Sequence, residues 1–428
     1  MIGRLRGVFE KLPDARGKSN NQRYGIEDAA LSAFAIFFTQ SPSFLDYQLR
    51  MQQQQGKNNA QSLFGVHQIP SDNQIRNLLD PITPQTLFPF MASIGDDLYR
   101  DGYLEAFRSV GKTFLIALDG TDFFSSKNIS CACCSCAKQK NGETLYRHIA
   151  VTPVLVAPGQ PNVIALTPEF VQPQDGHDKQ DCEINAATRW LAQWAQHYVP
   201  WGITVLGDDL YCHQPFCQRV LEAKAQFLFT CKPDSHPAVY EWVADLTRIE
   251  RVDNISRTRW TGKKRLTDTY RYLNQVPLRD TDDALMVNWC ELTTTNEQGE
   301  VLYHNAWATS HPISEHNLEP LAKAGRARWK IENEGNNTLK TKGYHFEHNF
   351  GHGKQHLANL LATMILLAYL LHTTLDWIDQ SYRTVRRLLP SRRTFFEHVR
   401  TLLLYLPFDD WGHLMRFMLK KLDPPDTG

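Results

Sequence analysis

Three acidic residues are spaced so that a fold can bring them together into a metal site. Asp119 ends the apolar run FLIALD, Asp208 ends a second apolar run, ITVLGD, and Glu332 lies far downstream in RARWKIENE, a segment with helical character. Carboxylate oxygens are hard ligands that suit Mg²⁺ or Mn²⁺. Two such ions, roughly 3.5–4 Å apart, activate an attacking oxygen and stabilise a leaving one in phosphodiester chemistry. The three acids therefore predict a catalytic two-metal site.

The segments around the aspartates indicate an α/β fold. Strand-like runs at 114–120, 148–159 and 162–170 are followed by a helix near 181–197, a strand at 203–207, a helix near 215–225 and a strand at 226–232. This is the element order of a ribonuclease-H-like mixed sheet. Asp119 and Asp208 would then follow adjacent strands at the edge where open α/β sheets place their sites.

The rest of the chain divides around this predicted catalytic core. We expect a helical N-terminal domain, with a possible role in DNA binding, and a β-rich insertion that separates Glu332 from the two aspartates. The helical pattern returns toward the end of the chain. The predicted boundaries are 1–108 for the N-terminal domain, 109–233 and 311–360 for the core, 234–310 for the insertion and 361–428 for the C-terminal region.

Helical spacing selects Glu332 over its neighbour Glu334. At about 100° per residue, Glu332 shares a face with Leu321, Gly325, Arg328, Trp329, Asn336 and Leu339, whereas Glu334 shares one with Lys323, Arg326 and Lys330. The first face is mixed and predicted to point inward, and the second is predicted to be solvated. Asp122 and Asp209 also neighbour the strand ends, and we assign them supporting or surface roles.

The combination of motifs resembles the DDE transposases of bacterial insertion sequences, in the group with a β-rich insertion and a Tyr-Arg-Glu-Lys signature around the last acid. That signature places two residues between Tyr and Arg, three between Arg and Glu, and six between Glu and Lys. Arg328 and Glu332 match it, while Gly325 stands at the tyrosine position and Lys340 lies one residue after the lysine position. The family's usual Asp-Arg-Gly-Tyr around the second acid is Asp-Asp-Leu-Tyr here, at 208–211.

The resemblance implies a transposase with Asp119, Asp208 and Glu332 as catalytic metal ligands. Two Mg²⁺ or Mn²⁺ ions would support nicking of DNA at the ends of the element, and the freed 3′ hydroxyl would attack a target DNA. Such proteins act as homodimers in a synaptic complex. Arg328 and Lys340 would contact DNA. A nuclease that cleaves without joining and a DNA-binding repressor that has lost catalysis are the alternatives.

Local basic patches must supply any DNA contact, because 46 Lys and Arg residues balance 46 Asp and Glu. The segment 248–271 is dense in Lys and Arg, interleaved with aromatic residues, and we expect Lys263, Lys264 and Arg265 to bind the phosphate backbone. A second basic segment spans 381–421. In both cases the alternative is an ordinary solvated surface.

Cysteine and histidine residues could form a second metal site. The run CACCSC holds Cys131, Cys133, Cys134 and Cys136, whose Cys-x-x-Cys pairs can bind zinc, with His148 as a further ligand. No second pair is obvious in the sequence, so an inert or redox-sensitive loop is the favoured interpretation. A later run contains His345, His348, His352 and His356, for which phosphate contact is the favoured role.

The bulk composition fits a globular protein of the cytoplasm. The chain has 42% hydrophobic residues and nine cysteines, and no apolar stretch of signal-peptide type opens it. The longest apolar stretch, at 357–371, is interrupted by Asn359 and is short for a membrane span, so we expect a buried core helix and no membrane partner.

Overall fold

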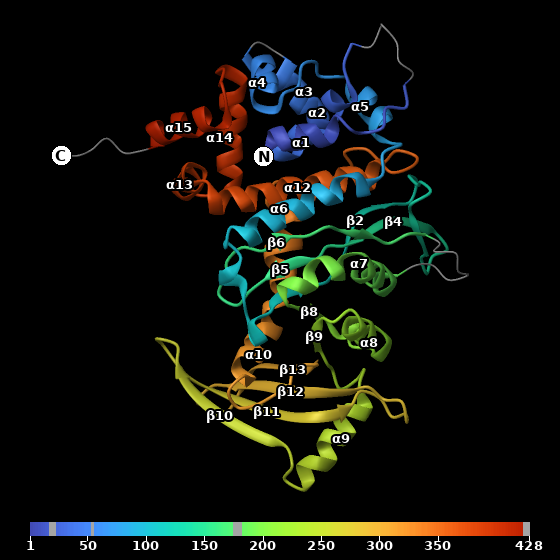
Figure 1. Cartoon of the computed structure of the whole chain (residues 1–428), viewed down its shortest axis with the longest axis vertical. Helices are drawn as coiled ribbons and strands as arrows, with labels where there is room; N and C mark the ends of the chain where they lie inside the picture. Colours follow the sequence, from blue (N-terminus) through green and yellow to red (C-terminus); the bar gives the residue numbers. More distant parts are fainter. Residues whose placement is uncertain (17–22, 53–54, 174–181, 423–428) are drawn as a thin grey trace, which may run out of the picture.

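The computed structural model describes residues 1–16, 23–52, 55–173 and 182–422, and it is α/β with a mixed sheet (Figure 1). The large sheet has nine strands in the order β10-β11-β12-β13-β9-β8-β1-β5-β6. Its strands are β1 (Phe114–Ala117), β5 (Val154–Val156), β6 (Ile164–Ala165), β8 (Ile203–Gly207), β9 (Gln226–Thr230), β10 (Asp253–Trp260), β11 (Arg265–Pro277), β12 (Met286–Thr295) and β13 (Val301–Thr309).

The centre of this sheet is parallel and the flanks are antiparallel. Strand β1 pairs in parallel with β8, and β8 in parallel with β9, whereas β5 and β6 continue antiparallel on the other side of β1. Every residue of β1 and β8 is buried. Strands buried on both faces read as continuous apolar runs rather than alternating ones, which is why these two stood out in the sequence.

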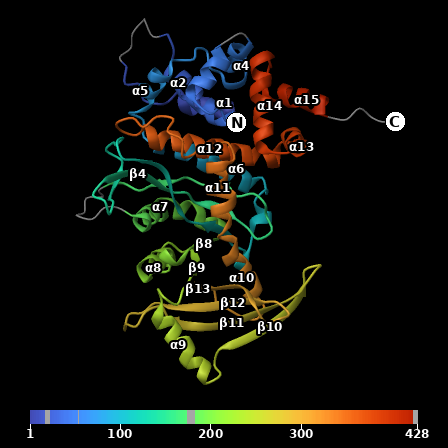
Figure 2. The same cartoon turned by 180° about the vertical axis from the view of Figure 1, so that it is seen from behind.

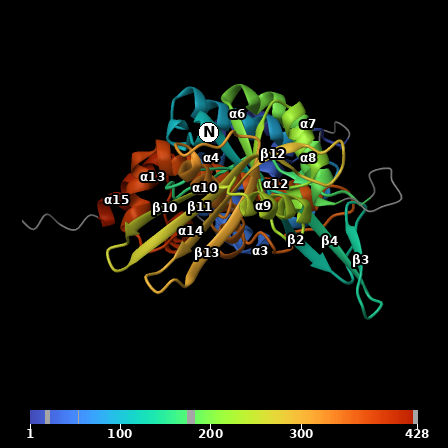
Figure 3. The same ribbon diagram turned by 90° about the horizontal axis from the view of Figure 1, so that it is seen from below.

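A smaller sheet branches from the large one beside the aspartates. It contains β2 (Gly120–Ser126), β3 (Ser135–Lys138), β4 (Thr144–Val151) and β7 (Glu169–Phe170). The predicted strand at 148–159 therefore divides between two sheets, at Thr152 and Pro153, because proline has no N–H to continue a ladder. The predicted strand at 114–120 also ends early, and the chain crosses into β2 at Leu118 and Asp119. Figure 3 shows β2, β3 and β4 projecting to one side of the molecule.

The β-rich segment extends the large sheet. Its four long strands, β10 to β13, form an antiparallel meander, and β13 pairs with β9 through Trp307, Ala308 and Thr309. The segment predicted as an insertion at 234–310 is thus hydrogen-bonded to the core, with helix α9 (Pro237–Arg248) packed against β11. It forms the lower end of the molecule in Figure 1.

Helices from both ends of the chain pack together at the opposite end of the molecule (Figures 1 and 2). The N-terminal set is α1 (Ile2–Phe9), α2 (Ile26–Phe38), α3 (Phe44–Gln52), α4 (Gln55–Phe64), α5 (Asp72–Leu79) and α6 (Phe88–Arg100). The C-terminal set is α12 (Leu357–Ile378), α13 (Gln380–Leu388), α14 (Arg392–Tyr405) and α15 (Trp411–Leu422). Helix α2 contacts α12, and Ser71 caps α5 by accepting a hydrogen bond from the Gln74 N–H at 3.4 Å.

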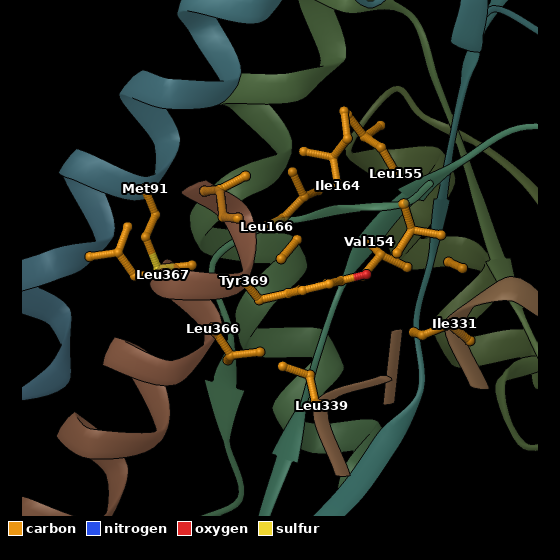
Figure 4. Packing of buried hydrophobic residues seen from close by; sticks show 14 of the residues in the cluster. Met91, Val154, Leu155, Ile164, Leu166, Ile331, Leu339, Leu366, Leu367 and Tyr369 are labelled. Atoms are coloured by element: carbon orange, nitrogen blue, oxygen red, sulfur yellow. The ribbon is translucent and has the colours of Figure 1, made fainter. Parts of the chain in front are cut away.

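Helix α12 is the central element of this helical layer. By length and composition it is a candidate to cross a membrane, yet 94% of its most apolar window is buried inside the protein. Figure 4 shows why: Leu366, Leu367 and Tyr369 of α12 pack against side chains of β5, β6 and α6. The prediction of a buried core helix is confirmed. The helix begins at Leu357, so the predicted domain boundary after residue 360 falls inside it.

The remaining helices connect the strands. Helices α7 (Glu183–Tyr198) and α8 (Gln214–Glu222) join the core strands, close to the predicted positions. After β13 the chain forms α10 (Leu318–Ala327), a π-helix at Ile331–Asn336 and α11 (Asn337–Thr341), which lead back toward α12 (Figure 2).

Candidate active site

The two aspartates leave the sheet side by side. The register of β1 and β8 pairs Ala117 with Leu206, and the Leu118 N–H donates to the Leu206 carbonyl oxygen at 2.9 Å. Asp119 and Asp208 each follow two residues after that pair, at the same end of two neighbouring parallel strands. The strand-end signal in the sequence therefore located both residues at one edge of the sheet.

Glu332 reaches this edge from the π-helix. Its carboxylate accepts a hydrogen bond from Arg328 Nη2 at 2.7 Å and remains 45% exposed. π-helical segments are rare and are frequent at functional sites. One turn further on, Asn336 Nδ2 donates to Asp119 Oδ2 at 3.1 Å, and the Thr152 hydroxyl donates to Asn336 Oδ1 at 2.9 Å. These contacts attach the π-helix to the segment that carries Asp119.

A fourth carboxylate, Glu183, lies in the same cluster. Glu183 is in the first turn of α7, where the helix dipole favours a negative charge. Its Oε1 accepts hydrogen bonds from the Gly120 N–H at 2.9 Å and from the Tyr211 hydroxyl at 2.6 Å. Sequence reasoning missed this residue, because Glu183 begins a helix well away from any strand end. The only available signal was an acidic residue at a helix start, which is common.

Two glycines make room for this arrangement. A Cβ on Gly120 would lie 2.4 Å from Glu183 Oε2, and a Cβ on Gly207 would lie 2.8 Å from the side chain of Tyr211. Without a Cβ, each glycine leaves space beside the neighbouring aspartate. In the structure the space is filled by Glu183 and Tyr211, so the glycines allow the fourth acid and its hydrogen-bonding partner to approach.

The cluster perturbs the ionisation of Asp119. Burial, followed by the negative charges of Glu183, Glu332 and Asp208, raises its pKa to about 7, and the positive charge of Arg328 opposes the shift. A raised pKa from several carboxylates in one place means that their charges repel one another. A bound cation would relieve that repulsion, and the all-oxygen donor set suits Mg²⁺ or Mn²⁺.

The carboxylates are near one another, but their oxygen atoms are not arranged around a single metal position. Among the described residues, two groups of His, Cys, Asp or Glu have ligand atoms that all lie within 4.8 Å of one another, and both groups consist of Cys and His. Asp119, Asp208 and Glu332 do not form such a group. The ion pair with Arg328 holds Glu332, and the Leu210 N–H donates to Asp208 Oδ1 at 2.9 Å.

The neighbouring acids have other partners. Asp122 forms an ion pair with Arg147 on the smaller sheet. Asp209 accepts a hydrogen bond from the Lys232 N–H at 2.7 Å and lies 3.4 Å from Nε2 of His236. Both acids therefore act within the local structure, which agrees with the supporting or surface roles expected for them.

The helical projection used to choose Glu332 holds only in part. Leu321, Gly325, Asn336 and Leu339 are buried as expected, but Trp329 is 63% exposed. Glu332, which was expected on the inward face, is exposed, as Glu334 is. The predicted inward position of Trp329 was wrong because α10 ends at Ala327 and Trp329 lies in the turn before the π-helix, where a fixed angle of about 100° per residue does not apply. Gly325 contacts the Trp307 indole, where a Cβ would lie 2.4 Å from Nε1, so a tyrosine does not fit at this position.

The predicted DNA-binding residues lie in three places. Lys263, Lys264 and Arg265 are exposed at the turn between β10 and β11, beside Trp260, which is 66% exposed. Lys340 forms an ion pair with Glu347 at 2.8 Å. Arg328 is at the carboxylate cluster itself, so the structure brings only this basic residue together with the acids.

We expect Asp119→Asn to stabilise the protein selectively at alkaline pH. A carboxyl whose pKa is raised on folding, from about 4 to about 7, contributes stability at low pH that is lost as the pH rises through 7. The asparagine amide at position 119 stays neutral at every pH, so the variant does not lose this stability as the pH rises. Without added divalent metal, the gain in melting temperature over the unsubstituted protein should be larger at pH 8 than at pH 5. Asp122→Asn, which breaks an ion pair, should give no such gain, and equal gains at both pH values would show that Asp119 ionises normally.

Comparison with known proteins gives no assignment: no protein-family model matches this chain, and no curated protein matches it.

Proposed function

We propose that the chain is a DDE transposase, which binds the ends of an insertion sequence and catalyses metal-dependent DNA cleavage and strand transfer. The observation that carries the proposal is the convergence of Asp119, Asp208 and Glu332 on one edge of the sheet, with the pKa of Asp119 raised in part by the other two. Four carboxylates in one place are costly to folding unless a ligand or a reaction uses them.

The strand order supports a ribonuclease-H-like core. Strands β6, β5, β1, β8 and β9 are neighbours in that order. The pairs β6–β5 and β5–β1 are antiparallel, and the pairs β1–β8 and β8–β9 are parallel. In chain order they are three strands, a helix, a strand, a helix and a strand, as the sequence predicted for such a core. The acids follow the first and fourth of these strands, and Glu332 comes from a helical segment beyond β13.

The residues of the cluster have separate roles in this proposal. Asp119, Asp208 and Glu332 would hold two Mg²⁺ or Mn²⁺ ions, which when bound supply an activated oxygen nucleophile and charge stabilisation for the leaving oxygen. Asn336 orients Asp119 through its hydrogen bond. Arg328 balances the negative charge of the cluster through its ion pair with Glu332, and a guanidinium is the kind of donor that binds phosphate oxygens.

The partners follow from the reaction class. DNA, as element ends and as target, is the substrate, a homodimer would pair two ends in a synaptic complex, and the cytoplasm is the expected compartment. The test is incubation of the purified protein and Mg²⁺ with a supercoiled plasmid that carries the gene and its flanking DNA. Nicking at the flanks followed by joining of the new 3′ ends to a second plasmid supports a transposase. Nicking without joining points to the nuclease alternative, and DNA binding without nicking points to a repressor.

We expect the triple variant Lys263→Ala/Lys264→Ala/Arg265→Ala to reduce the salt dependence of DNA binding. The three cations are exposed on one turn, and each lost phosphate contact lowers the slope of log affinity against log salt by about 1. Gel-shift titrations from 50 to 200 mM salt would measure it. The control is Lys138→Ala/Lys140→Ala, which removes two exposed cations at the end of β3, outside both basic segments. An unchanged slope in the triple variant would show that this turn is ordinary solvated surface and does not bind DNA.

A further inference from the structure

Four possible metal ligands meet at a point outside the carboxylate cluster. Cys131 and Cys134 lie in the connection between β2 and β3, His148 lies on β4, and His352 lies in the loop before α12. Their sulfur and ring nitrogen atoms are all within 4.8 Å of one another. In the sequence the two cysteines belong to the cysteine-rich run, His352 belongs to the histidine-rich run and His148 lies between the two runs, and the fold brings all four together.

The distances between these atoms match a tetrahedron around one ion. The two sulfurs are 3.8 Å apart, His148 Nε2 lies 3.4 Å from each sulfur, and His352 Nε2 lies 3.5 Å from the Cys134 sulfur. Tetrahedral zinc with Zn–S of about 2.3 Å and Zn–N of about 2.05 Å requires edges of about 3.8 Å between sulfurs and about 3.5 Å between sulfur and nitrogen. Four of the six distances among the ligand atoms therefore match the spacing around zinc, and the other two are within 4.8 Å.

The surroundings of the four side chains also indicate a ligand. His148 is 2% exposed and His352 is 8% exposed, and the Nε2 atom of each faces the sulfurs. Nδ1 of His352 has no hydrogen-bond partner among the described residues. The backbone N–H groups of Cys133 and Cys131 point at the sulfurs of Cys131 and Cys134, at 3.3 and 3.4 Å, a geometry that stabilises negative charge on sulfur. Burying two imidazoles against two thiols is costly unless their polar atoms are satisfied.

We propose that Cys131, Cys134, His148 and His352 bind one zinc ion as a structural site. Two sulfurs and two imidazole nitrogens form a Cys₂His₂ set, which favours Zn²⁺ over Mg²⁺ because magnesium prefers oxygen ligands. Four protein ligands leave no open position for a substrate, so the ion holds the chain in place and takes no part in the DNA chemistry. Cys133 and Cys136 remain outside the set.

The zinc ion would join the two segments that flank the carboxylate cluster. The smaller sheet continues directly from Asp119 through β2, and the loop with His352 follows the segment that carries Glu332. The same loop is also held by the Asp80 carboxylate, which accepts hydrogen bonds from the N–H groups of Lys354 and Gln355 at 2.9 and 3.0 Å. The histidine-rich run, for which phosphate contact was the favoured role, thus contributes His352 to a metal site in this proposal.

The test is the zinc content of the purified full chain, measured by mass spectrometry, with the absorption spectrum of the Co²⁺-substituted protein. We expect a zinc equivalent that is lost in Cys131→Ser and in His352→Ala and retained in the matched controls Cys136→Ser and His348→Ala. Co²⁺ should give the intense visible bands of a tetrahedral sulfur-ligated site. Cys231→Ser tests the other buried group, Cys212, Cys231 and His236, and should leave this equivalent in place.

The unsubstituted protein provides a second measurement in case the ligand variants fail to fold. Chelation of zinc should lower the melting temperature, and re-addition of Zn²⁺ but not Mg²⁺ should restore it, because an ion that binds only the folded state stabilises it. Absence of zinc from protein produced with zinc present, or retention of the same zinc and the same Co²⁺ spectrum by Cys131→Ser and His352→Ala, would overturn the proposal. Neither result depends on whether the chain cleaves DNA.

Discussion

Asp119→Asn and Asp208→Asn should each remove magnesium-dependent DNA cleavage while leaving DNA affinity nearly unchanged. Both acids follow the central parallel strands, and loss of either charge removes a metal ligand from the proposed site. Because loss of a residue that only orients a ligand costs about 10–100-fold, loss of a ligand itself should cost more. DNA affinity should persist, since it comes from phosphate contacts elsewhere. Plasmid nicking and gel-shift affinity measured on the same preparation test both parts.

The asparagine substitution is chosen from the hydrogen bonds of each acid. Asp119 Oδ2 accepts from Asn336, and Asp208 Oδ1 accepts from the Leu210 N–H, and an amide oxygen can still accept at Asp208. The matched controls are Asp122→Asn and Asp209→Asn, which change acids beside the same strand ends that have other partners. Both controls should keep cleavage within a few-fold of the unsubstituted protein. Normal nicking by Asp119→Asn or Asp208→Asn would exclude that residue from the site.

The sequence predicted the central strands well because their signal is local. Strands β1 and β8 are buried along their whole length, so each reads as an unbroken apolar run that ends at an aspartate. The parallel pairing of β1 and β8 followed from the intervening helix, since a crossover connection returns the chain in the same direction. Two of the proposed catalytic residues could therefore be placed at one edge without a structure.

The parts that the sequence did not predict depend on contacts between distant segments. Glu183 belongs to the cluster through hydrogen bonds with Gly120 and Tyr211, and nothing near Glu183 in the chain signals them. The exposure of Trp329 reflects the turn between α10 and the π-helix, where a fixed angle per residue does not apply. The Cys/His group joins residues 131 and 352, and no spacing rule links positions so far apart.

The position of the β-rich segment also depends on a contact between distant segments. The segment 234–310 was predicted to be β-rich and does contain strands, but composition and pattern do not show which strand pairs with the core. The pairing of β13 with β9 makes the meander an extension of the nine-stranded sheet. This pairing also sets where the chain returns to the site, since α10 and the π-helix follow β13 directly.

Glu332→Gln should reduce cleavage by orders of magnitude, whereas Glu334→Gln should keep near-normal activity. Both side chains are exposed, so the difference comes from their surroundings. Glu332 is paired with Arg328 at 2.7 Å and its charge contributes to the raised pKa of Asp119. At Glu334 the backbone carbonyl accepts a hydrogen bond from the Tyr369 hydroxyl at 2.6 Å, which does not involve the side chain.

The packing of the π-helix makes these two substitutions a matched pair. Ile331 and Leu339 are buried in the core that Figure 4 shows, beside Val154 and Tyr369, so the backbone around both glutamates is held by the same apolar contacts. Neither amide substitution removes any of these contacts, and equal melting temperatures would confirm that the fold is unchanged. Rates of magnesium-dependent nicking then isolate the effect of each charge. If Glu334→Gln lost activity and Glu332→Gln did not, Glu334 would be the third acid, and the assignment of Arg328 to the signature would also be wrong.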